Sequence, residues 1–111
     1  MYEKMLNHIL EQDLTDDLLV YKYSDSSTSF TSDISNELLY RFPKKVIIIA
    51  REKSGQMMMS LRNAGAKNLQ PIVANALAGL DGYGGGHEHA CGACVKTDDF
   101  DMFVKRIREK M

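Results

Sequence analysis

The sequence predicts a single α/β domain in which a mixed β-sheet of about four to five strands is flanked by helices. Segments with helical spacing of apolar residues alternate with short β-branched or aromatic runs, and no linker-like tract divides the chain. A chain of 111 residues is ordinarily one domain and can bury a core without disulfides or metal. We therefore expect one domain over residues 1–111, with an N-terminal helix and lead-in over 1–17 and the core over 18–111.

The first half of the chain is expected to form two helices separated by a strand. Met5, Leu6 and Ile9 recur with helical spacing, whereas the run Leu-Leu-Val-Tyr-Lys-Tyr is typical of a strand. A loop rich in serine and threonine follows, and Pro43 ends the second helix. The expected elements are a helix over 2–12, a strand over 18–23, a loop over 24–32, and a helix that Ser32 or Asp33 caps and that reaches Phe42.

The second half is expected to contain a hairpin, two helices and a last strand. The run Lys-Val-Ile-Ile-Ile-Ala-Arg is unbroken and apolar, which indicates a strand covered on both faces. Pro71 fits the first turn of a helix, where its missing N–H costs little. The expected elements are strands over 45–51 and 56–62 joined by a turn at 53–55, a helix over 68–79, a glycine-rich loop over 79–89, a strand over 90–96 and a helix over 98–110.

Composition narrows the classes of function. The net charge is −1, so the chain as a whole does not attract nucleic acid, and such binding would need a local patch. No apolar run approaches the length of a membrane span, and the N-terminus lacks the apolar region of a secretory signal. We expect a cytoplasmic protein without a membrane partner.

The most informative motif is the run of Gly84, Gly85 and Gly86 followed by His87. Glycines let a backbone come close to a ligand because no Cβ intervenes, and consecutive N–H groups can converge on an anion. His87 can donate a hydrogen bond to a phosphate oxygen. The alternative is a flexible hinge, but the small apolar residues that follow favour a ligand-facing loop. Tyr83, next to this motif, is either a stacking partner for a base or a packing residue.

Arg62 is the second candidate for ligand binding because it closes a predicted strand. Its planar guanidinium matches phosphate or carboxylate groups with two parallel hydrogen bonds. The alternative is a solvated arginine at the end of a strand. Loops at strand ends commonly line the ligand crevice of an open α/β sheet. We therefore expect Arg62, the loop rich in serine and threonine and the glycine motif to meet in one place.

Cys91 and Cys94 have the spacing of a redox pair or of half a zinc site, and His87 and His89 lie close by in sequence. Residues three apart on a strand point to opposite faces, so the two thiols are not expected to converge. This favours two structural apolar cysteines, while a metal site and a redox pair stay open as alternatives.

Two motifs together carry a resemblance to a known family. Met59-Ser60-Leu61-Arg62, then a predicted helix, then Gly-Gly-Gly-His-x-x-Ala-x-Gly before a strand and a final helix, resembles the DHHA1 domain. That domain is the C-terminal part of DHH-family phosphoesterases, including RecJ-like exonucleases and oligoribonucleases. The similarity runs from about residue 18 to the end. Glu88 stands where the common bacterial form has proline, so the motif resembles archaeal RecJ-like members more.

The resemblance implies a division of labour between two domains. A DHH catalytic domain, in the same chain or in a partner chain, would hold Mn²⁺ or Mg²⁺. The DHHA1 domain would grip single-stranded DNA or RNA, or short oligonucleotides. By matching position, Ser60, Arg62, Gly84, Gly85 and Gly86 would bind the substrate, and His87 would either approach the scissile region or donate a hydrogen bond to a phosphate. This sequence has no Asp-His-His motif and no other acidic cluster for two metals, so the chain alone is expected to hold no metal and to be inactive.

Two other functions remain open. One is a tRNA-binding module related to the C-terminal region of alanyl-tRNA synthetase, although the motif there tends to lack the histidine that stands here at position 87. The other is a protein-interaction module that docks on a replication factor. The favoured parent protein is a metal-dependent single-strand exonuclease or oligonucleotide phosphodiesterase.

Overall fold

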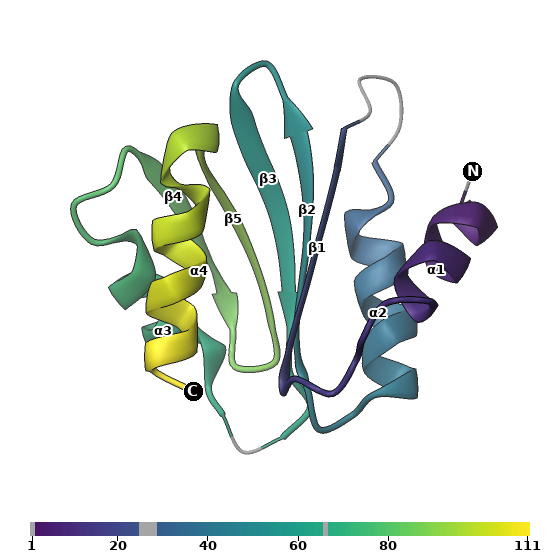
Figure 1. Ribbon diagram of the computed structural model, residues 1–111. Helices are drawn as coiled ribbons and strands as arrows, with labels where there is room; N and C mark the ends of the chain where they lie inside the picture. The colour runs from purple at the N-terminus through teal and green to yellow at the C-terminus, as the bar shows by residue number, and fades with distance from the viewer. Residues whose placement is uncertain (1, 25–28, 66) are drawn as a thin grey trace.

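A computed structural model, which describes residues 2–24, 29–65 and 67–111, shows a five-stranded mixed sheet between two pairs of helices (Figure 1). The single α/β domain predicted from the sequence is confirmed. In chain order the elements are α1 (Tyr2–Leu10), β1 (Leu18–Ser24), α2 (Thr31–Arg41), β2 (Val46–Lys53), β3 (Gln56–Arg62), α3 (Leu69–Leu77), β4 (Gly82–His87), β5 (Ala90–Lys96), a short 3₁₀ helix (Thr97–Asp99) and α4 (Phe100–Glu109).

The strands lie in the order β1-β2-β3-β5-β4. β1 and β2 are parallel and are connected through α2, whereas all other neighbours are antiparallel. The predicted hairpin between β2 and β3 turns at Ser54 and Gly55, whose φ angles are 55° and 77°. Two consecutive positive φ values match the twist of the flanking strands, which explains a glycine at the second position.

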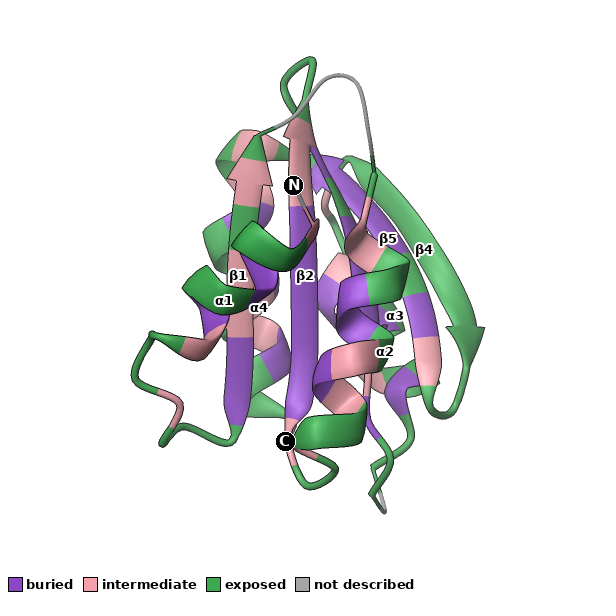
Figure 2. Ribbon diagram, turned by 90° about the vertical axis from the view of Figure 1, so that its right-hand side faces the viewer, coloured by how far each residue is buried: buried purple, intermediate pink, exposed green. Residues whose placement is uncertain are grey.

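β2 separates two hydrophobic cores (Figure 2). Its residues Val46, Ile48 and Ala50 pack toward α3 and α4, while Ile47 and Ile49 pack toward α1 and α2. All five are buried, as expected for a strand covered on both faces. Phe103 and Ile107 of α4, which are fully buried, complete the first core.

The glycine-rich segment is the main departure from the sequence prediction. Residues 79–89 were expected to form a loop, but six of them form β4, an edge strand that pairs with β5 from Gly82↔Val95 to His87↔Ala90. A Cβ on Gly82, Gly84 or Gly86 would lie 2.3–2.6 Å from a carbonyl oxygen of β5. The glycines therefore permit a close approach between two strands, and the predicted loop is wrong.

The predicted cap of α2 is also wrong. The helix begins at Thr31, and its N-cap residue Phe30 makes no side-chain capping bond. The hydroxyl of Ser32 instead accepts a hydrogen bond from Arg62 (3.1 Å), and this contact draws the serine toward the sheet. Residues 25–28 of the expected loop lie outside the described part of the chain. In the part that is described, no helix has the length and apolar character needed to cross a membrane.

Candidate functional site

Half of one sheet face is not covered by any helix. α1 and α2 pack over β1, β2 and part of β3, whereas β5 and β4 extend beyond them (Figure 2). Alternate residues of the three strands face this side, since Arg62 and Ser60 pair in register with Ile47 and Ile49 of the α2-side core. We call this surface the open face. Its members are Met58, Ser60 and Arg62 of β3, Ala90, Gly92 and Cys94 of β5, and Tyr83, Gly85 and His87 of β4.

Register arranges the open face into three rows that run across the strands. The first row is Arg62, Ala90 and His87, the second is Ser60, Gly92 and Gly85, and the third is Met58, Cys94 and Tyr83. Strands lie about 4.8 Å apart, so the outer members of a row are separated by about 10 Å at the backbone. Successive rows are two residues apart along a strand, or about 7 Å.

Arg62 lies at the end of the first row and is held from several sides. Its Nε donates to Oδ1 of Asn36 (2.8 Å), and its Nη2 donates to Oγ of Ser32 (3.1 Å). Its Nη1 donates to the carbonyl oxygens of Leu61 (3.0 Å) and Cys91 (3.3 Å). All these acceptors are neutral. Among the described residues no carboxylate forms an ion pair with Arg62.

The charge of Arg62 is thus fixed in place but not neutralised. The side chain is half-buried, and this burial lowers the pKa of its guanidinium from the ordinary value, although an arginine remains protonated in water at any ordinary pH. Neutral hydrogen-bond acceptors do not cancel the positive charge, so a cation held in this way can still bind an anion. Arg62 is therefore more firmly tethered than the solvated arginine that the sequence left open.

The second row consists of the hydroxyl-bearing Ser60 and two glycines, Gly92 and Gly85, which have no side chains. Ser60 is buried and its Oγ donates to Oγ1 of Thr31, at the start of α2 (3.0 Å). Gly92 and Gly85 continue the row across β5 and β4. A Cβ on Gly85 would meet no atom within 4 Å. A ligand can therefore approach the backbone closely at Gly85. At Gly84 and Gly86 the space that a Cβ would take is already filled by the backbone of β5.

His87 closes the first row from the other side. The residue is exposed, and the described part of the chain offers its imidazole no hydrogen-bond partner. Its backbone is fixed, because its carbonyl oxygen accepts a bond from Sγ of Cys91 (3.3 Å) and the carbonyl of the preceding Gly86 accepts one from the side-chain amide of Gln70. His87 thus lies across Ala90 from Arg62 in the first row, on a backbone that is fixed by these two bonds.

The third row borders a groove. Its volume is about 290 Å³, and it is lined by Ser29, Thr31, Arg51, Met58, Met59, Tyr83, Gly92, Ala93 and Cys94. The sequence prediction named the arginine, the glycine motif and the serine- and threonine-rich loop that contains Thr31, but it missed Asn36 and gave Met58 no part in the site. No local signal marks Asn36, because its role depends on α2 packing beside the end of β3.

The two cysteines point to opposite sides of β5, as their spacing on a strand predicts. Cys91 belongs to the core under α3 and α4, whereas Cys94 belongs to the open face. Both are free and buried, and burial raises the pKa of the Cys91 thiol. Among the residues that the structure describes, no group of three or more His, Cys, Asp or Glu side chains is placed to hold a metal ion.

Comparison with known proteins agrees with the fold and the motifs. A family model described as the DHHA1 domain matches residues 16–111. Among solved structures, the chain is similar to the C-Ala domain of alanyl-tRNA synthetase from Aquifex aeolicus, with 21% identity and a TM-score of 0.71 over 83% of this chain and 87% of that one. A comparison with curated protein sequences gave no significant match.

Two larger proteins contain a similar domain. RecJ from Thermus thermophilus, in complex with Mn²⁺, is 17% identical with a TM-score of 0.76 over 96% of this chain. A pGpG-specific phosphodiesterase from Vibrio cholerae is 13% identical with a TM-score of 0.61 over 99% of this chain. The chain spans 16% of the RecJ chain and 40% of the phosphodiesterase chain. At these identities the likeness concerns the fold.

Proposed function

This chain belongs to the DHHA1 domain family, and we propose that its open face binds the phosphates of a nucleic acid or short oligonucleotide. A DHH catalytic domain, in the same chain or in a partner, supplies the hydrolytic chemistry. The parent activity in this proposal is that of a RecJ-like single-strand exonuclease or an oligonucleotide phosphodiesterase. The proposal is supported by the exonuclease RecJ and a pGpG-specific phosphodiesterase, which are among the proteins that share the fold.

The observation that carries the proposal is the environment of Arg62. A half-buried guanidinium costs desolvation energy, and a protein that only needed a structural cation would pair it with a carboxylate. Here Asn36 and Ser32 orient the guanidinium through neutral oxygen atoms, so its positive charge can still attract an anionic ligand. Four of the five N–H hydrogens of Arg62 are donated to Asn36, Ser32, Leu61 and Cys91, so one hydrogen on Nη2 is left for a phosphate oxygen, which it would bind through a single charge-assisted hydrogen bond.

The other predicted site residues have distinct parts in this proposal. A phosphate lies above Ala90, between Arg62 and His87, and the imidazole donates a hydrogen bond to it. Gly85 lets the sugar or phosphate approach β4, and Ser60 holds the start of α2 beside the site through its bond to Thr31. Gly84 and Gly86 act indirectly, because they allow β4 to pair closely enough with β5 to carry Gly85 and His87.

The metal ions of the reaction are assigned to the other domain. RecJ structures that share this fold hold Mn²⁺ or Mg²⁺. The residues described in this chain do not fit such ions, because they form no group of three potential ligands. His87 therefore positions the substrate in our proposal and is not a metal ligand.

A second candidate function is binding of tRNA. It is favoured by the likeness to the C-Ala domain of alanyl-tRNA synthetase, with a TM-score of 0.71. The two functions share the phosphate-binding surface but differ in the ligand that should bind more tightly.

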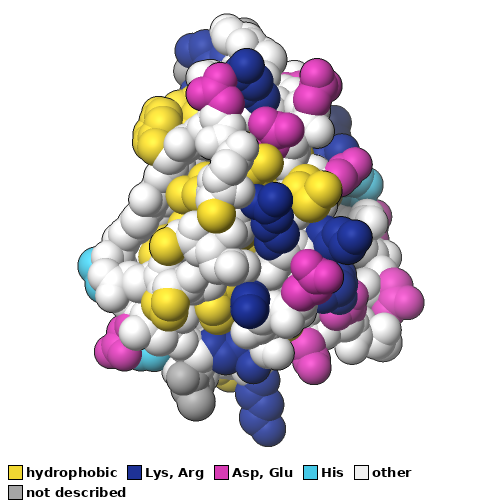
Figure 3. Space-filling view, turned by 90° about the vertical axis from the view of Figure 1, so that its left-hand side faces the viewer, with side chains coloured by type: hydrophobic (Ala, Val, Ile, Leu, Met, Phe, Trp, Pro, Cys, Tyr) yellow, Lys and Arg dark blue, Asp and Glu magenta, His cyan; other side chains and the backbone are white. Residues whose placement is uncertain are grey.

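Titration of the ¹⁵N-labelled chain with short single-stranded oligonucleotides, mononucleotides and a tRNA acceptor hairpin tests the proposal. We expect weak, salt-sensitive binding, with amide shifts concentrated at Gly85, His87 and Arg62, because only a few phosphates are contacted. The amides of α4 serve as the internal control. Its side of the molecule intersperses basic and acidic side chains (Figure 3) and should not respond. Absence of shifts on the open face at millimolar ligand and low salt would refute the proposed function.

A further inference from the structure

We propose that the third row of the open face, formed by Tyr83, Met58 and Cys94, is a stacking platform for one nucleobase of the bound substrate. This inference rests on the proposed function, because it assumes that a phosphate binds at the first row. It adds a specificity-determining residue, Tyr83, and a minimum substrate length.

The exposure of these side chains is the first argument. Four large hydrophobic residues of the described chain are exposed, and two of them, Tyr83 (68%) and Met58 (39%), share this row. Cys94 lies between them and is buried, so the row has an apolar base with an aromatic ring at its edge. Aromatic and sulfur-containing side chains are polarisable and attract the faces of planar rings.

The groove beside this row is the second argument. Its volume of about 290 Å³ lies just below the range for drug-sized ligand sites, which begins at about 300 Å³, and leaves space for a ligand fragment such as a single base. It is open to solvent and bounded on one side by Arg51, which forms no ion pair among the described residues. An apolar groove with a cation on one side and a tyrosine on the other is suited to a base and to the phosphodiester that joins it to the nucleotide on the first row.

The spacing of the rows sets the length of the ligand. Arg62 and Met58 are four residues apart on β3, and His87 and Tyr83 are four residues apart on β4, so the first and third rows are separated by about 13 Å. This exceeds the reach from the phosphate to the base within one nucleotide. Given this separation between the backbone positions of the two rows, the proposal assigns the phosphate on the first row and the base on the third row to neighbouring nucleotides, so the smallest ligand that uses both is a dinucleotide.

The platform should tolerate all bases. Stacking uses the face of the base, and every base has such a face, so Tyr83 and Met58 would give little sequence discrimination. The row presents few groups that could read the hydrogen-bonding edge of a base. The site should therefore discriminate by length and by the presence of a base more than by base identity.

The test compares three ligands and five variants of the whole chain. The ligands are inorganic phosphate, a mononucleotide and a 5′-phosphorylated dinucleotide, each titrated by NMR at low salt. We expect Tyr83→Ala to weaken dinucleotide binding about 5- to 30-fold, the lower part of the range for loss of one stacked base, and to leave phosphate and mononucleotide binding unchanged. Tyr83→Phe should bind like the parent chain, because stacking needs the ring and not the hydroxyl. Tyr40→Ala, on α2 and 87% exposed, is the matched control for loss of an exposed tyrosine.

The fourth variant gives a direct signal. The chain contains no tryptophan, so Tyr83→Trp introduces a single indole whose fluorescence should be quenched by the dinucleotide and not by phosphate. Equal binding of the dinucleotide by Tyr83→Ala and the parent chain, with no quenching of the indole, would overturn the platform. If Tyr83→Ala weakened binding of the mononucleotide and the dinucleotide equally, the assignment of the phosphate and the stacked base to neighbouring nucleotides would be wrong. If Arg62→Ala also leaves every ligand unaffected, the proposed function itself has failed, which distinguishes the two conclusions.

Discussion

Replacing Arg62 with alanine probes the candidate site most directly. The change removes the one guanidinium that is held by Asn36 and Ser32 on the open face. Loss of a charge-assisted hydrogen bond to a phosphate should weaken ligand binding by about 1.5–3 kcal/mol, which corresponds to about 10- to 150-fold in Kd. Removing one phosphate contact should also reduce the slope of log K against log salt by roughly 0.7–1.

The same substitution should reduce stability by a smaller amount. Arg62 links β3 to α2 through two hydrogen bonds and to β5 through one, and a fourth bond stays within β3. Ser32 and Asn36 are exposed and regain water when the arginine is removed, and the arginine no longer has to be desolvated. We expect the free energy of unfolding to fall by about 1 kcal/mol, at the level of a single net hydrogen bond, and Tm to fall by about 4–8 °C.

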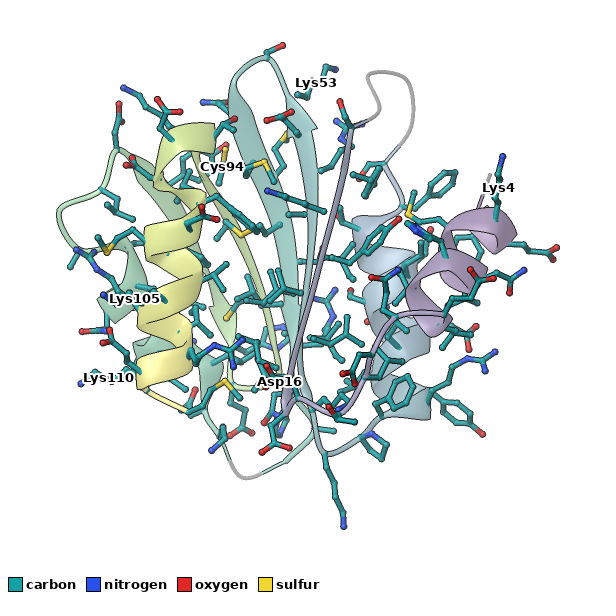
Figure 4. All side chains as sticks on the ribbon, in the orientation of Figure 1. Lys4, Asp16, Lys53, Cys94, Lys105 and Lys110 are labelled. Atoms are coloured by element: carbon teal, nitrogen blue, oxygen red, sulfur yellow. The ribbon has the colours of Figure 1, made fainter. Side chains whose placement is uncertain are left out.

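The assay combines NMR titration of a short oligonucleotide with thermal unfolding followed by circular dichroism. Arg62→Lys keeps the charge but not the planar fork, so it should recover only part of the affinity. Lys105→Ala is the matched control, because it removes one positive charge from α4, on the far side of the sheet (Figure 4). A large loss of stability with unchanged binding and unchanged salt dependence would show that Arg62 is a structural residue only.

Three further predictions follow from the geometry of single residues. Gly84→Ala should destabilise the fold by about 2 kcal/mol or more, because its Cβ would lie 2.6 Å from the carbonyl oxygen of Gly92. Gly85→Ala should fold normally and bind ligand less well, because its Cβ meets no atom of the protein but would obstruct the ligand. Equal melting temperatures of the two variants would contradict this prediction. Hydrogen bonds from the backbone N–H of Leu18 and from Arg108 lower the pKa of Asp16, so its contribution to stability is present above pH 3.8, the ordinary value, and is lost as the pH falls below it. Acid titration of unfolding should therefore be flatter in Asp16→Asn. The isolated chain should not hydrolyse phosphodiesters with or without Mn²⁺, and metal-dependent release of mononucleotides by a nuclease-free preparation would contradict this. Zinc that stays bound after chelator treatment would instead support a metal site formed by His and Cys side chains.

Much of the architecture could be read from the sequence because the signals are local. The apolar run from Val46 to Ala50 is buried throughout, as its composition indicates for a central strand. Asn68 caps α3 by accepting a hydrogen bond from the backbone N–H of Gln70, and Pro71 sits in the first turn. The spacing of Cys91 and Cys94 correctly placed their thiols on opposite sides of a strand.

The glycine motif is the segment whose structure could not be predicted from local sequence patterns. Six residues with four glycines among them have low strand propensity and no alternation of polar and apolar side chains, so the sequence indicated a loop. Pairing with β5 along the whole segment, together with the absence of Cβ atoms at Gly82, Gly84 and Gly86, makes it an edge strand.

The sequence by itself determined the class of fold, the buried central strand and the motifs that resemble the DHHA1 domain. Only the tertiary structure decided that Arg62, Ala90 and His87 form one row and that Asn36 and Ser32, from α2, orient the arginine. These partners are 26 and 30 residues away from Arg62 along the chain. Their contact depends on the register of three strands and on the packing of one helix, and both are set by burial across the whole domain rather than by neighbouring residues.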